Sequence, residues 1–188
     1  MSTTLDPRPG ALADLSPGTW AVDPAHSTVG FVARHLMITK VRGHFSDFDG
    51  AVTIAPDPLA SSVVASVRLA SVDTGSAERD GHLRSPDFFD VETHPEMTLT
   101  STGIRPDGDD YVLSADLTIA GITRPIELAL TFDGVTTDPW DNAKAGFTAW
   151  ANINRKDWDL SWNVALETGG VLVSEKIRIE LDIQLVRS

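Results

Sequence analysis

"KIRIELDIQLV", residues 176–186, alternates apolar and polar side chains over ten positions. The apolar positions are Ile177, Ile179, Leu181, Ile183 and Leu185, and a charged or amide side chain precedes each of them. Successive side chains of a strand point to opposite faces, so the stretch predicts a strand with one apolar and one wet face. Strands of this kind are typical of antiparallel sheets that face water on one side.

The same alternation recurs in four further stretches, at residues 27–37, 62–72, 111–119 and 124–132. Shorter runs near 41–45, 51–54, 96–102 and 144–153 raise the expected total to eight or nine strands, separated by turn residues such as Asp107-Gly108. Many strands and little helix favour a barrel or a sandwich. A strand of about ten residues extends over roughly 33 Å. An eight-stranded barrel of such strands is elongated, and its interior is either filled or able to hold one small ligand.

The chain of 188 residues is long enough for one domain with a substantial core. Residues 1–18 contain prolines and glycines without periodicity, which predicts a flexible N-terminal tail before a barrel domain over 19–188. A net charge of -12 argues against a nucleic-acid partner and against docking on anionic lipid. There is no cysteine, which excludes disulfides and leaves the compartment undecided. The sequence shows no apolar run long enough for an integral membrane segment and no signal peptide at the start, so we expect a cytoplasmic protein.

"GSAERDGHLRSP", residues 75–86, is the one clear break in the strand pattern. Ser76 as N-cap, Glu78 in the first turn and Pro86 as a stop predict a short helix or turn-rich loop at one barrel mouth. Arg79 and His82, three residues apart, would share a helix face. The five histidines show no metal-ligand spacing, so no metal is expected. We interpret the segment as a polar latch in which Arg79 and Asp80 pair with loop backbone or with each other, with or without contact to a ligand head group.

His26 and Ser27, with Asp23 nearby, invite a hydrolase interpretation in which Ser27 is the nucleophile. Adjacent strand residues point to opposite faces, and no G-x-S-x-G turn presents the serine, so the pair is a poor catalytic unit. Two interpretations remain open for it: polar contacts to a ligand head group, or a structural turn after Asp23.

Two aromatic groups also stand out. If the chain is extended at Phe88 and Phe89, their rings point to different faces, one into the core and the other over a tunnel or a dimer contact. Trp150, Trp158 and Trp162 are spaced to lie close together across a bend. They indicate either barrel packing or an aromatic wall for an apolar chain.

Four blocks, in order, resemble the YceI-like family: "TWAVDPAHSTVGFVARHLMITKVRGHFSDFDG", "ERDGHLRSPDFFDVETHPEMTLTS", "ADLTIAGITRPIEL" and "NINRKDWDLSWN". The resemblance implies an all-β fold: an extended antiparallel lipocalin-like β-barrel with one short helix or lid segment, whose tunnel binds polyisoprenoid or isoprenoid-quinone chains. It also implies a homodimer. Two positions depart from the family pattern, Asp159 in place of a glycine and His44 in place of a small residue. If either pointed inward, the tunnel would be narrower or more polar.

The sequence therefore predicts a protein that binds or carries a long apolar lipid in the barrel interior, with no catalytic residue, metal or cofactor. The expected ligand contacts are His26, Ser27, Phe31, Arg79, Asp80, His82, Phe88, Phe89, Trp150, Trp158 and Trp162. The alternatives are an enzyme that acts on a small apolar substrate, with His and Asp at the mouth as acid and base, and a structural domain with a filled core.

Overall fold

The computed structural model describes residues 11–166 and 172–188. Within these ranges the chain forms eleven strands and one α-helix. The strands are β1 (Gly18–Val22), β2 (Thr28–His35), β3 (Thr39–Phe45), β4 (Phe48–Ile54), β5 (Ser62–Arg68), β6 (Val72–Asp73), β7 (Glu96–Asp107), β8 (Asp110–Ile119), β9 (Ile122–Thr137), β10 (Ala143–Asn154) and β11 (Lys176–Arg187). The helix is α1 (Ala77–Arg84), and the short 3-10 turns are η1 (Leu12–Asp14), η2 (Pro24–His26), η3 (Pro58–Ala60), η4 (Leu69–Ser71) and η5 (Arg155–Trp158).

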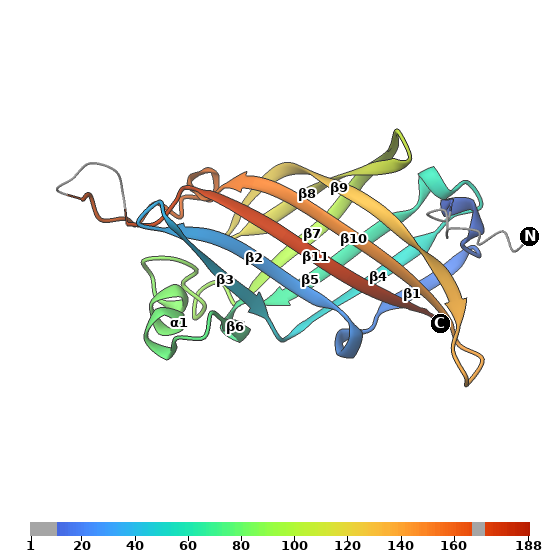
Figure 1. Ribbon diagram of the computed structural model, residues 1–188, viewed down its shortest axis with the longest axis horizontal. Coiled ribbons are helices and arrows are strands. Elements are labelled where there is room, and N and C mark those ends of the chain that lie inside the picture. Colours follow the sequence, from blue (N-terminus) through green and yellow to red (C-terminus); the bar gives the residue numbers. More distant parts are fainter. Residues whose placement is uncertain (1–10, 167–171) are drawn as a thin grey trace, which may run out of the picture.

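Eight strands close into an elongated antiparallel barrel in the order β1-β4-β5-β7-β8-β9-β10-β11, and β11 pairs back to β1. One edge of β11 is shared between two partners: its first half pairs with β2, and its last residues pair with β1. From β2 the sheet continues through β3 to β6, as a flap on the barrel wall. The alternation favoured a barrel or a sandwich and the family resemblance implied a barrel; the barrel is confirmed, and Figure 1 shows its long strands running between two distinct ends.

Residues 11–18 do not behave as the flexible tail that the sequence predicted. Leu12 and Leu15 are 5% and 3% exposed, and they pack with Trp20 and Leu185 in one core cluster. The Leu12 N–H also donates to the Tyr111 hydroxyl at 3.3 Å. The leucines are three residues apart on a 3-10 turn, a spacing that a search for strand alternation misses. They close the barrel at the end opposite α1 (Figure 1), whereas residues 1–10 lie outside the described part of the chain.

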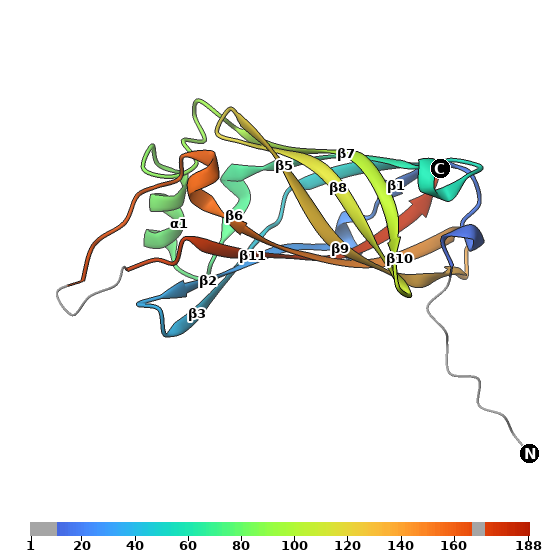
Figure 2. The same cartoon turned by 90° about the horizontal axis from the view of Figure 1, so that it is seen from above.

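The predicted helix is present at the other end of the barrel. Ser76 Oγ accepts a hydrogen bond from Arg79 N at 3.3 Å, and the helix ends at Arg84, with Ser85 as its C-cap directly before Pro86. Figure 2 shows that α1, the β2–β3 hairpin and the segment before β11 gather at this end, the α1 end. Among the described residues no helix is both long and apolar enough to cross a membrane.

Candidate functional site

A cavity of about 720 Å³ runs through the interior of the barrel. Its wall is made by the inward faces of the alternating strands; on β11 the five lining residues run from Ile177 to Leu185. At roughly 3.3 Å per residue this row extends over about 26 Å. The volume lies within the range of small-molecule pockets, roughly 300–1,000 Å³. A cavity of this size and length is inconsistent with the filled-core alternative.

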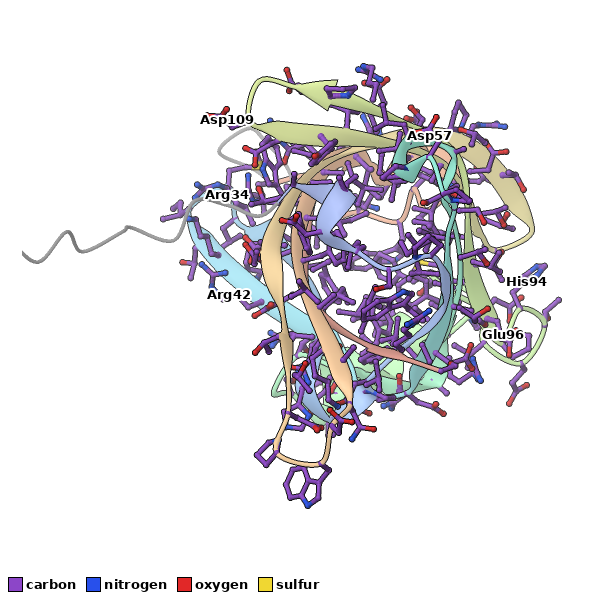
Figure 3. The ribbon with its side chains drawn as sticks, turned by 90° about the vertical axis from the view of Figure 1, so that its right-hand side faces the viewer. Arg34, Arg42, Asp57, His94, Glu96 and Asp109 are labelled. Atoms are coloured by element: carbon purple, nitrogen blue, oxygen red, sulfur yellow. The ribbon has the colours of Figure 1, made fainter. Side chains whose placement is uncertain are left out.

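The interior wall is apolar along most of its length. Figure 3 looks along the barrel and shows labelled polar residues such as Arg42, His94 and Asp109 on the outside. The end opposite α1 is lined by Leu12, Leu15, Ile54, Pro58 and Ile104. The hydrophobic effect therefore favours an apolar guest over water along this wall.

Polar lining is concentrated at the α1 end. The polar and charged lining residues there are Arg34, His35, Thr74, Ser76, Glu78, Arg79, His82 and Arg155. Elsewhere the polar lining residues are Asp49, Ser61 and Thr98. A cavity with one polar end suits a ligand that has a polar head and a long apolar tail, because a few placed polar groups orient the head.

Arg79 and Asp80 fasten α1 to the loop at Thr74. Asp80, 7% exposed, accepts hydrogen bonds through Oδ1 from Thr74 N at 2.9 Å and from the Thr74 hydroxyl at 2.5 Å. Arg79 Nε donates to that hydroxyl, and Arg79 Nη2 donates to the Thr74 carbonyl, both at 2.7 Å. Arg79 and Thr74 line the cavity, but Asp80 is absent from its wall. The four hydrogen bonds thus form a latch between helix and loop.

His82 sits in an aromatic cluster at the same end. Its Nε2 lies 2.9 Å from Asp87 Oδ2. Its ring meets Trp162 and Phe88 edge-on, with centroids 4.5 and 5.1 Å apart. His82, Phe88 and Trp162 all line the cavity. We call this group the mouth cluster. It combines the polar edge of the His82 ring with the apolar faces of two aromatic rings, an arrangement that suits a ligand with a small polar head.

Arg155 was missed as a site residue, although it lies inside the quoted block "NINRKDWDLSWN". It is 4% exposed, lines the cavity, and lies 5.9 Å from the Phe88 ring centroid. Its guanidinium donates to the carbonyls of Ser174, Leu160, Trp162 and Val173. Burial lowers the pKa of this guanidinium from its ordinary value. Arg155 therefore ties the segments on either side of residues 167–171 to the barrel beneath the mouth cluster.

His26 and Ser27 do not belong to the cavity wall, in contrast to the predicted polar mouth. His26 is exposed, and its Nδ1 lies 2.8 Å from Asp23 Oδ2. The Ser27 hydroxyl accepts from Gln184 N at 3.0 Å and donates to the Gln184 carbonyl at 3.4 Å. Asp23 also caps η2 by accepting from Ala25 N. The pair therefore shapes the turn between β1 and β2, which is the structural interpretation left open by the sequence.

The three tryptophans do not form one aromatic wall. Trp162 lines the cavity, whereas Trp158 is 2% exposed and sits in the core, donating from Nε1 to the Leu117 carbonyl at 2.9 Å. Trp150 is 41% exposed on the outer face, with Arg178 stacked 4.3 Å from its ring centroid. The spacing of the three tryptophans predicted that they lie close together at one bend. Side chains alternate along β10, however, so Trp150 points outward between the inward-facing Ala149 and Ala151.

The phenylalanines fit the predicted ligand contacts more closely. Phe31, Phe88 and Phe89 all line the cavity. The chain is not extended at the last two, because Phe89 N donates to the Leu83 carbonyl within a turn. Both rings therefore reach the interior side, rather than opposite faces as expected.

Neither departure from the family pattern points into the cavity. His44 is exposed on the outer face of β3 opposite Gly30. Asp159 is exposed and has a left-handed φ of 60°, at the end of η5. A glycine adopts this φ without steric cost, and Asp is among the few other residues that tolerate it. The described residues hold no group of three or more His, Asp or Glu side chains able to bind a metal ion.

The YceI-like domain is matched by residues 20–185. The chain belongs to the YceI-like family. Protein YceI of Escherichia coli is 41% identical over 136 residues, which cover 72% of this chain and 71% of that protein.

Solved structures share the barrel of this YceI-like protein. BcnA of Burkholderia cenocepacia superposes with a TM-score of 0.72 at 25% identity, over 87% of this chain and 98% of BcnA. A polyisoprenoid-binding domain of Saccharophagus degradans, implicated in plant cell wall breakdown, gives a TM-score of 0.69 at 18% identity, over 90% and 98% of the two chains. At that identity the second likeness is one of fold.

Proposed function

We propose that this protein binds and carries a long apolar lipid inside its barrel, with a polyisoprenoid or an isoprenoid quinone as the ligand. The tail occupies the apolar length of the cavity, and the head group lies at the α1 end beside the mouth cluster. The observation that carries the proposal is the elongated cavity of about 720 Å³ whose polar lining is concentrated at one end.

Hydrophobic burial is sufficient to hold such a chain. Each Å² of apolar surface removed from water contributes about 25 cal/mol, so a long tail binds with few polar contacts. No side chain has to react, and the protein needs no cofactor for this role. The domain of Saccharophagus degradans that is described as polyisoprenoid-binding has the same fold, which is compatible with a tunnel used in this way.

Two adjacent residues of β5 provide a matched test. Ala65 lines the cavity near its middle, whereas Val64 is 57% exposed on the outer face of the same strand. Ala65→Phe places a ring inside the tunnel, and Val64→Phe adds a comparable ring outside. Uptake of an added polyprenol is measured by native mass spectrometry. We expect Ala65→Phe to weaken uptake at least tenfold and Val64→Phe to leave it unchanged. Equal uptake by both variants would contradict an interior ligand.

An enzyme acting at the mouth is the second candidate, with the His82–Asp87 pair as its acid and base. It requires that His82→Ala abolish turnover of a small apolar substrate while polyprenol uptake persists. Carriage instead predicts that His82→Ala changes only the affinity for the head group. Homodimer formation and cytoplasmic residence, which the resemblance and the sequence implied, stay predictions; light scattering after size exclusion tests the first and fractionation of the host cell the second.

A further inference from the structure

The tip of the β2–β3 hairpin exposes three consecutive apolar side chains at the α1 end. Leu36, Met37 and Ile38 are 39%, 51% and 76% exposed. Apolar side chains of this size at a turn are unfavourable in water unless another surface covers them. Figure 2 shows the hairpin projecting from the body of the barrel.

The backbone holds these side chains outward. Leu36 and Met37 both have left-handed φ values, 54° and 59°, a conformation that is uncommon for bulky apolar residues. Ile38 N donates to the His35 carbonyl at 3.1 Å, and Arg34 Nη1 donates to the Ile38 carbonyl at 3.2 Å. The turn keeps large apolar residues at positions that favour glycine or asparagine, which is consistent with a use for those side chains.

The same hairpin is basic in an acidic protein. Residues 33–45 contain Arg34, Lys40 and Arg42 but no Asp or Glu, although the whole chain carries a net charge of -12. All three cations are exposed. On the neighbouring β11, Glu180 lies 3.5 Å from Arg42 Nη1, but it is shared with Arg178. The negative net charge of the whole chain predicted no attraction to anionic lipid. The hairpin, in contrast, carries a local excess of positive charge, which would attract anionic lipid.

The hairpin is continuous with the mouth of the cavity. Arg34 and His35 contribute to the cavity wall. Leu36 N donates to the Leu172 carbonyl at 2.8 Å, and Leu172 and Val173 also line the cavity. A surface that contacts the hairpin tip therefore lies beside the opening through which a ligand passes at this end.

We propose that the β2–β3 hairpin docks this protein on an anionic lipid bilayer, with Leu36, Met37 and Ile38 inserted at the interface and Arg34, Lys40 and Arg42 against the head groups. Apolar side chains flanked by Lys and Arg are the combination that binds membrane interfaces. If the hairpin tips of two copies of this chain packed together, their positive charges would repel, so self-association through the tip is disfavoured. Docking would let a long lipid pass between bilayer and cavity; this consequence rests on the proposed function, whereas docking itself does not.

Vesicle binding by the full chain tests the proposal. The probes are vesicles of equal parts phosphatidylcholine and phosphatidylglycerol, and vesicles of phosphatidylcholine alone, with binding measured by co-sedimentation at low and high salt. The tip variant is Leu36→Asn, Met37→Asn and Ile38→Ser together, since Asn tolerates the left-handed backbone. The charge variant is Lys40→Gln. The control is Trp140→Ser, which removes an 80% exposed tryptophan from the β9–β10 turn at the opposite end (Figure 1).

We expect the unmodified protein to bind the anionic vesicles, and to bind them less as salt rises. The tip variant should lose at least tenfold in affinity, Lys40→Gln about fivefold, and Trp140→Ser nothing. Docking would be overturned if the unmodified protein did not bind anionic vesicles, or if the tip variant bound them as tightly as the unmodified protein. An equal loss of affinity in Trp140→Ser would also overturn it. It would also be overturned if the tip variant only changed the oligomeric state in light scattering. Polyprenol uptake without vesicles is measured in parallel, so a failure of lipid carriage is separable from a failure of docking.

Discussion

Thr74 and Asp80 are joined by two hydrogen bonds to one carboxylate oxygen, from Thr74 N at 2.9 Å and from the Thr74 hydroxyl at 2.5 Å. They connect the end of β6 to the first turns of α1, and Arg84 adds a bond from Nε to the Ala70 carbonyl at 2.9 Å. The helix has little apolar surface of its own to bury, and Asp80 is its one buried residue. Polar contacts therefore hold α1 at the cavity mouth.

Asp80→Ala should lower the free energy of unfolding by about 2 kcal/mol, because it leaves the Thr74 donors without their buried acceptor. Chemical denaturation measures the loss. Glu78→Ala, on the same helix but exposed, is the control, and removing its charge near the helix N-terminus should cost about 0.5 kcal/mol. An equal effect of the two substitutions would contradict the latch.

Arg155→Met should be more damaging, with a loss of about 3 kcal/mol, since the carbonyls that this guanidinium satisfies lose their donor. Lys156→Met is the neighbouring control. Lys156 is exposed and pairs with Glu175 at 2.7 Å, so its removal should cost less than about 1 kcal/mol. Thermal and chemical unfolding of both variants separate the two roles. If Arg155→Met were as stable as Lys156→Met, Arg155 would not anchor the mouth.

Asp159→Gly should stabilise the protein by about 0.5–1 kcal/mol, because glycine adopts the left-handed φ of 60° without a Cβ clash. Asp159→Ala should destabilise it by about 1–2 kcal/mol, since alanine lacks the local hydrogen bonding that makes aspartate tolerable there. Melting temperatures of the two variants check the order. A glycine variant less stable than the alanine variant would show that the Asp159 side chain itself is needed.

Acid should weaken the turn that joins β1 and β2. The hydrogen bond from His26 lowers the pKa of Asp23 below its ordinary value of 3.8, with smaller contributions from the Ala25 N–H and from Lys144 and an opposing one from burial. Since the unfolded state takes up the proton first, this stabilisation is complete above the ordinary pKa and is lost as pH falls through the native one.

The stability difference between the unmodified protein and Asp23→Asn should therefore shrink as pH falls from about 5 to about 3. Asn can still accept from Ala25 N, so the substitution keeps the cap on η2 while removing the charge. Urea unfolding at a series of pH values gives the difference. A gap that widens toward low pH would contradict a lowered pKa for Asp23.

Whether a structural feature could be predicted from the sequence depended on how far apart in the chain its interacting residues lie. The inward row from Ile177 to Leu185 was predictable because alternation on a strand fixes which side chains share a face. The helix over 77–84 was predictable because Ser76 and Pro86 are local signals. Both depend on neighbours in the chain.

Features set by contacts between distant strands were not predictable in this way. The inward positions of Ala149 and Ala151 put Trp150 outside, and only the pairing of β10 shows which face is inward. Arg155 binds carbonyls up to 19 residues away, so its sequence neighbours did not reveal its role. The hairpin at Leu36 is basic, although the whole chain has a net charge of -12, so the net charge alone did not reveal this local property.

The most direct measurement of lipid carriage is native mass spectrometry of the protein purified from its own host, followed by organic extraction and identification of whatever is released. Carriage predicts a co-purifying polyisoprenoid or isoprenoid quinone at near one per chain, lost in Ala65→Phe and kept in Val64→Phe. An empty protein that also takes up no added polyprenol would contradict it.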